Sequence, residues 1–242
     1  MRNLVFLCAL VVVQLGAGCT TFNNARPLAQ GQHAANATMG GPLTNVPGVG
    51  TIPLPNLTLE GRSGLKPLIG SHLDVNYGLH VLPLVFGVAG GHVGATGQFV
   101  DENGFVPAVS VGQRFFFFTN LFDPRKGRKD GFAMSQTDVT ASYLFFDSQL
   151  LYGGLTMYVP LDAGARVPRF APVLGVELHP LKDWGLQWLG IQLETRWLAP
   201  DVDQRFAVVD WVSPGDQGAI TLNIGVGIRW SDFLENTAEV KQ

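Results

Sequence analysis

Apolar and polar residues alternate strictly along residues 219–230 (AITLNIGVGIRW). Every even position from Ile220 to Trp230 is apolar, and every odd position from Thr221 to Arg229 is polar or glycine. A period of two residues is typical of a β-strand, because successive side chains point to opposite faces. The stretch therefore predicts a strand with one apolar face and one polar face, and we expect it to be the closing strand of the fold.

The same alternation recurs along most of the chain and predicts nine earlier strands. It is strong in residues 72–82, where Leu73 and Val75 alternate with Asp74 and Asn76. Glycine, proline, asparagine and aspartate cluster between the strands, as expected for turns and loops. With the closing strand, the set predicts an all-β, up-and-down antiparallel barrel of about ten strands. The nine earlier strands fall near residues 33–39, 54–62, 72–82, 84–99, 105–118, 138–145, 151–159, 170–179 and 189–197.

The distribution of charge indicates that the outer faces of these strands meet lipid. Charged residues make up only 14% of the chain, against about 25% in soluble domains. No apolar run approaches the roughly 18 to 20 residues of a transmembrane helix, so an integral membrane chain has to be a barrel. We expect a transmembrane barrel over residues 31–230. The five lysines lie outside the predicted strands, at Lys66, Lys126, Lys129, Lys182 and Lys241.

The predicted connections differ in length between the two ends of the barrel. Those expected at the end where the first strand begins are short, whereas most of those at the opposite end are long. Outer-membrane barrels combine short periplasmic turns with longer outer loops, and aromatic girdles near both interfaces. Aromatic residues such as Phe105, Phe117 and Trp230 lie near the predicted strand ends. The long connections fall near residues 41–52, 119–134, 162–167 and 199–218, whereas Pro83 marks a tight turn at the same end.

The N-terminus has the features of a secretion signal. Arg2 precedes an apolar run, residues 4–13, of the length of a signal-peptide core. Residues 15–19 (LGAGC) resemble the bacterial lipobox, and the resemblance implies a signal peptide over residues 1–18 with lipidation at Cys19 and sorting to the outer membrane. The alternative is ordinary signal-peptide cleavage, with Cys19 a free thiol. Residues 19–30 lack a period, so we expect a lipidated tether.

The closing strand carries a second resemblance. Asn223, Gly225, Ile228 and Trp230 follow the pattern polar-x-Gly-x-x-apolar-x-aromatic, which is similar to the final strand of bacterial outer-membrane β-barrel proteins. The resemblance implies location in the bacterial outer membrane, contact with outer-membrane lipids, and recognition by the barrel assembly machinery. Residues 231–242 follow the pattern and are expected to form a periplasmic C-terminal tail.

The polar face of the predicted strands is expected to line the barrel interior. A barrel of about ten strands has a narrow interior that side chains largely fill. We interpret its charged residues as a buried network of compensating ion pairs, and a channel lining is the alternative. The predicted network consists of Asp74, Asn76, Arg114, Asp138, Glu177, Glu194, Arg196 and Arg229.

Candidate sites for metal or catalysis are weak in this sequence. Histidines 72, 80, 92 and 179 fall on the predicted interior face, but their spacing spreads them apart, whereas a metal needs converging ligands. Ser71 and His72 are adjacent, and neighbours in a strand point to opposite faces. We therefore expect no metal, no cofactor and no enzymatic activity, with an outer-membrane lipid hydrolase as the enzymatic alternative.

Possible partners and functions follow from charge and location. The net charge of −3 provides no basic field for nucleic acid. The basic loop within residues 119–134 is a candidate contact for lipopolysaccharide phosphates. Our leading interpretation is an outer-membrane β-barrel lipoprotein with a structural, envelope-interaction or minor transport role. The alternatives are a small passive channel and a lipid-anchored periplasmic barrel that binds an apolar ligand.

Overall fold

The protein is described by a computed structural model that covers residues 21–68, 71–85, 87–121, 131–146, 149–161, 168–180, 188–203 and 210–231. The proposed signal peptide, Cys19 and residues 232–242 of the predicted tail lie outside the described residues. Within them, no helix has the length and apolar character needed to cross a membrane. The elements are β1 (Gln32–Val46), β2 (Gly50–Pro53), β3 (Asn56–Leu68), β4 (Ser71–His80), α2 (Val81–Val85), β5 (Val88–Val100), β6 (Ala108–Asn120), β7 (Gly131–Phe145), β8 (Gln149–Pro160), β9 (Arg169–Leu178), β10 (Leu189–Asp203), η3 (Pro214–Asp216) and β11 (Gln217–Ser231).

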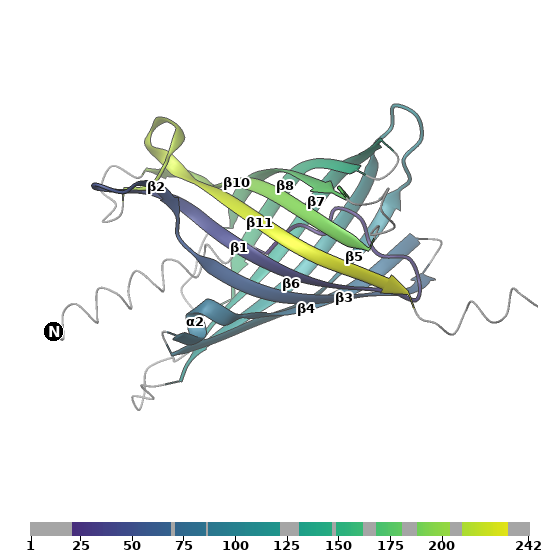
Figure 1. Ribbon diagram of the computed structural model, residues 1–242, viewed down its shortest axis with the longest axis horizontal. Coiled ribbons are helices and arrows are strands. Elements are labelled where there is room, and N and C mark those ends of the chain that lie inside the picture. Colours follow the sequence, from purple (N-terminus) through teal and green to yellow (C-terminus); the bar gives the residue numbers. More distant parts are fainter. Residues whose placement is uncertain are drawn as a thin grey trace, which may run out of the picture.

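Ten of these strands close into an antiparallel barrel (Figure 1). Consecutive strands pair from β3 to β11, and β1 completes the ring by pairing with both β3 and β11. The β1–β11 ladder runs from Gln32 opposite Ser231 to Pro42 opposite Thr221. The predicted up-and-down barrel of about ten strands is therefore confirmed. We call the end where β1 begins and β11 ends the near rim, and the opposite end the far rim.

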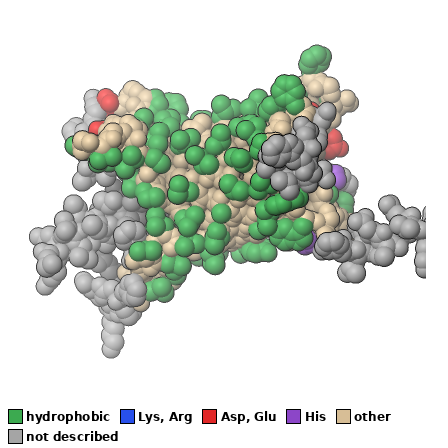
Figure 2. Space-filling model, in the orientation of Figure 1, with side chains coloured by type: hydrophobic (Ala, Val, Ile, Leu, Met, Phe, Trp, Pro, Cys, Tyr) green, Lys and Arg blue, Asp and Glu red, His purple; other side chains and the backbone are tan. Residues whose placement is uncertain are grey.

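The alternation along each strand separates lipid from lumen. In β11, Thr221 and Asn223 are buried inside the barrel, whereas Leu222 and Ile224 are exposed on its outer surface. Figure 2 shows hydrophobic side chains over the barrel wall, with acidic groups at its ends. Within a bilayer every backbone polar group needs an internal partner, and a closed barrel meets that requirement. The molecule is therefore a membrane-spanning barrel of the outer-membrane type, as predicted.

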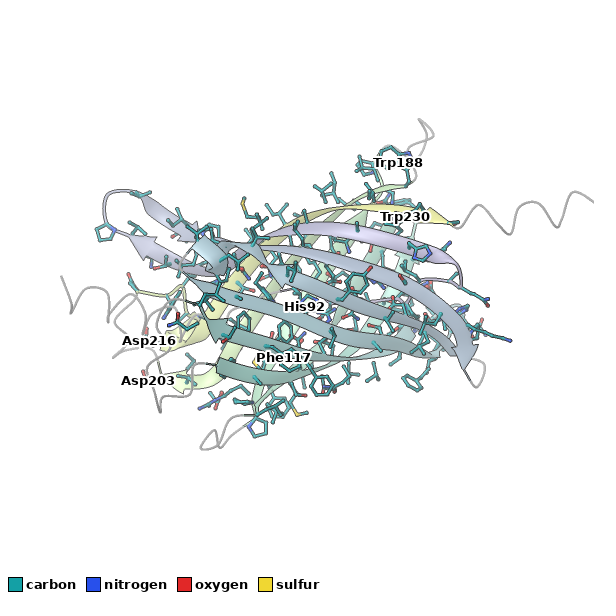
Figure 3. The ribbon with its side chains drawn as sticks, turned by 90° about the horizontal axis from the view of Figure 1, so that it is seen from below. His92, Phe117, Trp188, Asp203, Asp216 and Trp230 are labelled. Carbon is teal, nitrogen blue, oxygen red and sulfur yellow. The ribbon has the colours of Figure 1, made fainter. Side chains whose placement is uncertain are left out.

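The two rims carry different structures. Figure 3 places Trp188 and Trp230 at one end of the barrel and Asp203 and Asp216 at the other. Both tryptophans are about half exposed, which suits side chains at a membrane–water interface. The near rim thus has the aromatic character that the sequence predicted.

The predicted connections at the far rim are partly wrong in extent. The region 41–52, expected to be a loop, continues β1 beyond the barrel and folds back as β2, with Val46 paired to Gly50. The glycine signals there mark the turn of this hairpin, because Gly48 and Gly50 adopt positive φ angles of 78° and 106°. The short helix α2 replaces the predicted turn at Pro83.

Two further boundaries differ from the prediction. In the region 199–218, β10 continues to Asp203 past an irregularity that begins after Leu198, and β11 already begins at Gln217. Lys66, expected in a turn, lies in β3, where it is exposed near the end of the strand. Strand ends that project past the bilayer meet water, so a lysine is tolerated there. The prediction that lysines lie outside the strands is therefore wrong at the end of β3, where Lys66 is exposed.

Candidate functional site: the barrel lumen

Residues 21–28 lie inside the barrel, and we call them the luminal segment. Phe22, Asn23, Ala25 and Leu28 are at most 4% exposed. In Figure 1 this purple stretch enters the barrel at the end to which the arrow of β11 points. The sequence analysis expected a tether between lipid and barrel at this position. The position inside the lumen explains the missing period, because each residue meets a different strand rather than a regular neighbour.

Three side chains of β10 hold the main chain of the luminal segment. Glu194 Oε2 accepts a hydrogen bond from the Asn23 N–H at 2.9 Å. Gln192 Nε2 donates to the Asn23 carbonyl oxygen at 3.3 Å, and Arg196 donates to the Thr21 carbonyl oxygen. Each of these three residues points into the lumen from the same strand face, so β10 presents a row of groups to the backbone of Thr21 and Asn23.

Two residues of the neighbouring strands β3 and β4 hold the other end of the segment. Asp74 Oδ2 accepts from the Leu28 N–H at 3.0 Å, and Arg62 Nη2 donates to the Arg26 carbonyl oxygen at 2.6 Å. Arg62 and Asp74 also form a buried ion pair with each other. The pair is therefore compensated in charge and still reaches the backbone of the segment.

Two glycines give the segment room against the barrel wall. A Cβ atom on Gly225 would lie 2.0 Å from Phe22 Cε2, and one on Gly64 would lie 1.8 Å from the Ala29 carbonyl oxygen. Real Cβ atoms do not approach that closely, so only glycine allows these contacts. Gly225 therefore has a packing role in addition to the assembly-signal role that the sequence predicted for it.

A surface ion pair fixes the segment at the near rim. Arg26 contacts Glu102 in the β5–β6 connection and donates to Ser142 Oγ at 3.1 Å. The Arg26 guanidinium, together with a hydrogen bond from the Leu144 N–H, holds the pKa of Glu102 below its ordinary value. The carboxylate is therefore charged at neutral pH and retains Arg26.

The charged residues predicted for the lumen form ion pairs at two depths. Arg196 and Glu194 are fully buried, joined at 2.7 Å, and extended by Tyr152 and Tyr158. Arg229 and Glu177 pair nearer the rim, where the Arg229 side chain is 39% exposed and His179 also contacts Glu177. The predicted interaction across β9, β10 and β11 is thus present as two groups.

The other predicted luminal residues are also buried. Arg114 donates to Thr21 Oγ1 at 2.6 Å, and Asp138 accepts from Gln136 and from Thr156 at 2.6 Å. The Asn76 amide is buried and has no hydrogen-bond partner among the described side chains. Asn223 is buried in the lumen, whereas Ile228 and Trp230 face outward.

Sequence reasoning missed several luminal residues. Arg62 was placed at the end of a strand, although it shares the inward face of Glu60 and the structure buries both. Tyr152 and Tyr158 carry hydroxyl groups on the inward face of β8, in register with Thr156. The period of two was sufficient to place all four inside. The luminal segment itself carried no such signal.

An aromatic layer fills the lumen toward the far rim. Phe116, Phe118, Met134, Tyr158 and Ala171 form one buried cluster. Phe116 and Phe118 lie close to the far end of β6, and the connections of the far rim follow them. This layer and the luminal segment therefore obstruct the lumen at different heights.

Two histidines pack against the aromatic layer. The rings of His80 and His92 are 5.6 Å apart, and His92 lies 5.1 Å from Phe116. His92 also lies 3.3 Å from Glu60. His72 lies on the same strand face as Asp74 and Asn76, but it is exposed near the beginning of β4 and is not enclosed by the lumen. Among the described residues, no group of three or more His, Cys, Asp or Glu side chains is arranged to hold a metal ion.

Little free volume is found beside the luminal segment. A void of about 20 Å³ lies between Phe22, Arg62, Glu177 and Arg229, which is about the space of a single water molecule. Around the luminal segment, the described side chains and backbone therefore occupy most of the lumen.

No protein-family model and no curated protein matches the chain. Among solved structures, it is similar to the translocator domain of autotransporter NalP from Neisseria meningitidis, with 10% identity, a TM-score of 0.43, and coverage of 95% of this chain and 98% of that chain. It is also similar to the NanC porin, with 9% identity, a TM-score of 0.43, and coverage of 81% and 98%. A third similarity is to OmpT, an outer membrane protein of Vibrio cholerae, with 13% identity, a TM-score of 0.33, and coverage of 89% and 72%. These likenesses concern barrel architecture alone.

Proposed function

We propose that this outer-membrane β-barrel has a structural or envelope-interaction role and is closed in its resting state by its own luminal segment. The observation that carries the proposal is the burial of residues 21–28 among Arg62, Asp74, Glu194 and Arg196. A permanently open channel needs a continuous water-filled path. The luminal segment and the aromatic layer both lie across that path. Minor transport then requires displacement of these groups.

Planar-bilayer recording tests the closed state against the passive channel. Purified wild-type protein should produce no discrete conductance steps, because the lumen is filled. Glu194→Ala should also be silent, since the aromatic layer toward the far rim is untouched. Discrete steps in the wild type that Glu194→Ala abolishes would instead identify a channel lined by the polar network, and the proposal would fail.

The orientation of the faces argues against the apolar-ligand alternative. That alternative requires an apolar interior and a polar exterior, whereas the outer surface carries exposed Leu79, Val93 and Ile224 and the interior carries paired charges. An integral barrel should stay in the membrane after extraction with high salt. It should also migrate differently in a gel before and after heating. Release by salt would contradict membrane integration.

As an alternative to the closed resting state, we propose that Cys19 carries the lipid implied by its lipobox-like sequence. Thr21 is held by Arg114 and Arg196, which lie near the middle of β6 and β10. Half a tilted strand spans about 15 Å, whereas two residues reach at most about 7 Å. A lipid on Cys19 that is anchored in the leaflet at the near rim therefore requires the luminal segment to move out of the lumen. Lipidation and the seated segment are alternative states.

Labelled palmitate tests this proposal. Wild-type protein should incorporate the label and Cys19→Ser should not. Equal incorporation, or none in either protein, would contradict lipidation at Cys19 and leave ordinary signal-peptide cleavage as the explanation.

The remaining partners are proposals as well. Outer-membrane lipids would cover the apolar wall, and the barrel assembly machinery would read β11 through Asn223, Gly225, Ile228 and Trp230. Most of the basic loop within residues 119–134, proposed to contact lipopolysaccharide, lies outside the described residues. We propose no enzymatic activity, and hydrolysis of phospholipid or lipid A by the purified protein would contradict this.

A further inference from the structure

The lumen binds both the main chain and the side chains of the luminal segment. Two carboxylates, Glu194 and Asp74, accept from backbone N–H groups, and three donors, Gln192, Arg196 and Arg62, bind backbone carbonyl oxygens. Hydrogen bonds to charged groups are stronger than those between neutral groups. These main-chain contacts are available to any chain that adopts the same bent path through the lumen.

Side chains of the segment add position-specific contacts, among them Asn23 Oδ1 with Arg196 and Arg26 with Glu102. Phe22 fills the notch left by Gly225, and Ala25 packs against Leu150, Tyr152 and Val173. Asn24 is buried, but its amide nitrogen has no hydrogen-bond partner within the described structure. Phe22 is therefore the expected side-chain anchor, and Asn24 is the matched position at which substitution should matter little.

We propose that the lumen is a binding site for a short polypeptide segment, which residues 21–28 occupy as an intramolecular ligand and which a second copy of that segment can occupy once the first is detached. This inference rests on the proposed function, because it requires the seated segment of the closed barrel. A tethered ligand is present at millimolar effective concentration, so exchange is expected only after the tether is cut.

The connection between segment and barrel offers a place for that cut. Ala29 and Gln30 are exposed at the near rim, and Gly31 turns the chain into β1 with a φ of 73°. All five main-chain contacts lie before this turn. Cleavage there separates the ligand from the wall without removing any of the contacts that hold it.

The test uses the full chain with a protease site in place of residues 29–31, folded in detergent micelles and then cleaved. A fluorescent peptide of residues 21–30 should bind the cleaved barrel and not the uncleaved one. A peptide N-methylated at Asn23 and Leu28 should bind at least 10-fold more weakly, because it lacks both N–H donors. Phe22→Ala should weaken binding by a similar factor, and Asn24→Ala should leave it within about threefold.

The outcomes separate the two proposals. Absence of peptide binding to a cleaved barrel that is silent in bilayers overturns the binding site and leaves the closed barrel intact. Equal binding of the N-methylated peptide overturns recognition through the main chain. Conductance steps from the uncleaved wild type overturn the closed barrel itself.

A second measurement tests the proposal without cleavage, in case the variant with the protease site does not fold. The full-length Phe22→Ala chain leaves the notch at Gly225 empty while keeping every other residue. Because Phe22→Ala weakens binding of the tethered segment about 10-fold, a peptide with a photoreactive group at the position of Phe22 should displace it when added at about the millimolar effective concentration of the tether. The peptide should then crosslink to β11 near Gly225, unlabelled peptide should compete with it, and the wild-type chain should crosslink far less. Absence of this crosslink in the folded Phe22→Ala barrel would overturn the proposal.

Discussion

At the scale of single residues, Gly225 provides the space that the luminal segment needs inside the barrel. Its missing Cβ is the space in which the Phe22 ring lies. The residue sits in a strand with a strict period of two, so its inward direction follows from the sequence. Its contact partner is 203 positions away along the chain and does not follow from the sequence.

Gly225→Ala should displace Phe22 and destabilise the barrel by about 1–3 kcal/mol, because it overpacks a filled interior. The free energy of unfolding can be measured by urea titration in detergent. Gly97→Ala is the matched control, since its new Cβ would meet its nearest neighbour at 3.5 Å. The double variant Gly225→Ala with Phe22→Ala should recover part of the loss. Equal losses of unfolding free energy for Gly225→Ala and Gly97→Ala would contradict the packing of Phe22 against Gly225.

The two ion-pair groups predict different costs for removing an arginine. Arg196→Met leaves the fully buried Glu194 carboxylate uncompensated and should cost about 3–5 kcal/mol. Arg229→Met breaks a partly exposed pair and should cost at most about 1 kcal/mol. Chemical unfolding of both variants gives the comparison. A loss at Arg229 as large as that at Arg196 would show that the rim pair is as desolvated as the inner pair.

At the scale of elements, the luminal segment behaves as an eleventh piece packed into a ring of ten strands. It has no strand partner and is positioned by side chains from β3, β4, β6 and β10. The ion pair of Arg26 with Glu102 fastens it to the β5–β6 connection. The segment is therefore the element whose position responds to changes at the rim.

Acid should loosen the segment at Glu102. Because its pKa in the folded protein lies below the ordinary value of 4.5, the stabilisation by its carboxylate is fully present above pH 4.5. It is lost as the pH falls through the lowered pKa. The difference in unfolding midpoint between wild type and Glu102→Gln should be constant from pH 7 to about 5 and shrink below that. In an Arg26→Gln background most of the difference should be absent, and its persistence there would assign the effect to another partner.

At the scale of the whole molecule, the apolar wall sets the position of the barrel in the bilayer. Val93 lies near the middle of β5 and is 52% exposed on the outer surface. Phe105 lies in the β5–β6 connection at the near rim and is 99% exposed. Val93 is therefore expected at the centre of the bilayer and Phe105 at its edge.

An arginine at Val93 should destabilise the barrel by about 2–4 kcal/mol, whereas an arginine at Phe105 should cost about 0–1 kcal/mol. The reason is that the cost of a charge on the lipid face depends on its depth. Unfolding in lipid vesicles, where the bilayer is present, provides the measurement. If Phe105→Arg were the more damaging of the two, the assigned membrane zone would be wrong.

The sequence by itself determined the barrel, because burial on one face imposes a period of two that can be read locally. Asp74, Arg114, Glu194 and Arg196 were placed inside from that period alone. Strand ends were less certain, since β1 and β10 continue beyond the lipid-facing zone, where the pattern weakens.

The tertiary structure alone decided what fills the barrel. Residues 21–28 carry no period because their partners come from β3, β4, β6 and β10, at different heights and from different sides. The side-chain contacts of this segment, such as Arg26 with Glu102 and Phe22 with Gly225, are each made once and repeat at no fixed interval. The strands could be predicted because burial of one face repeats at every second residue. The luminal segment depends on contacts that exist only once the ring of strands has closed.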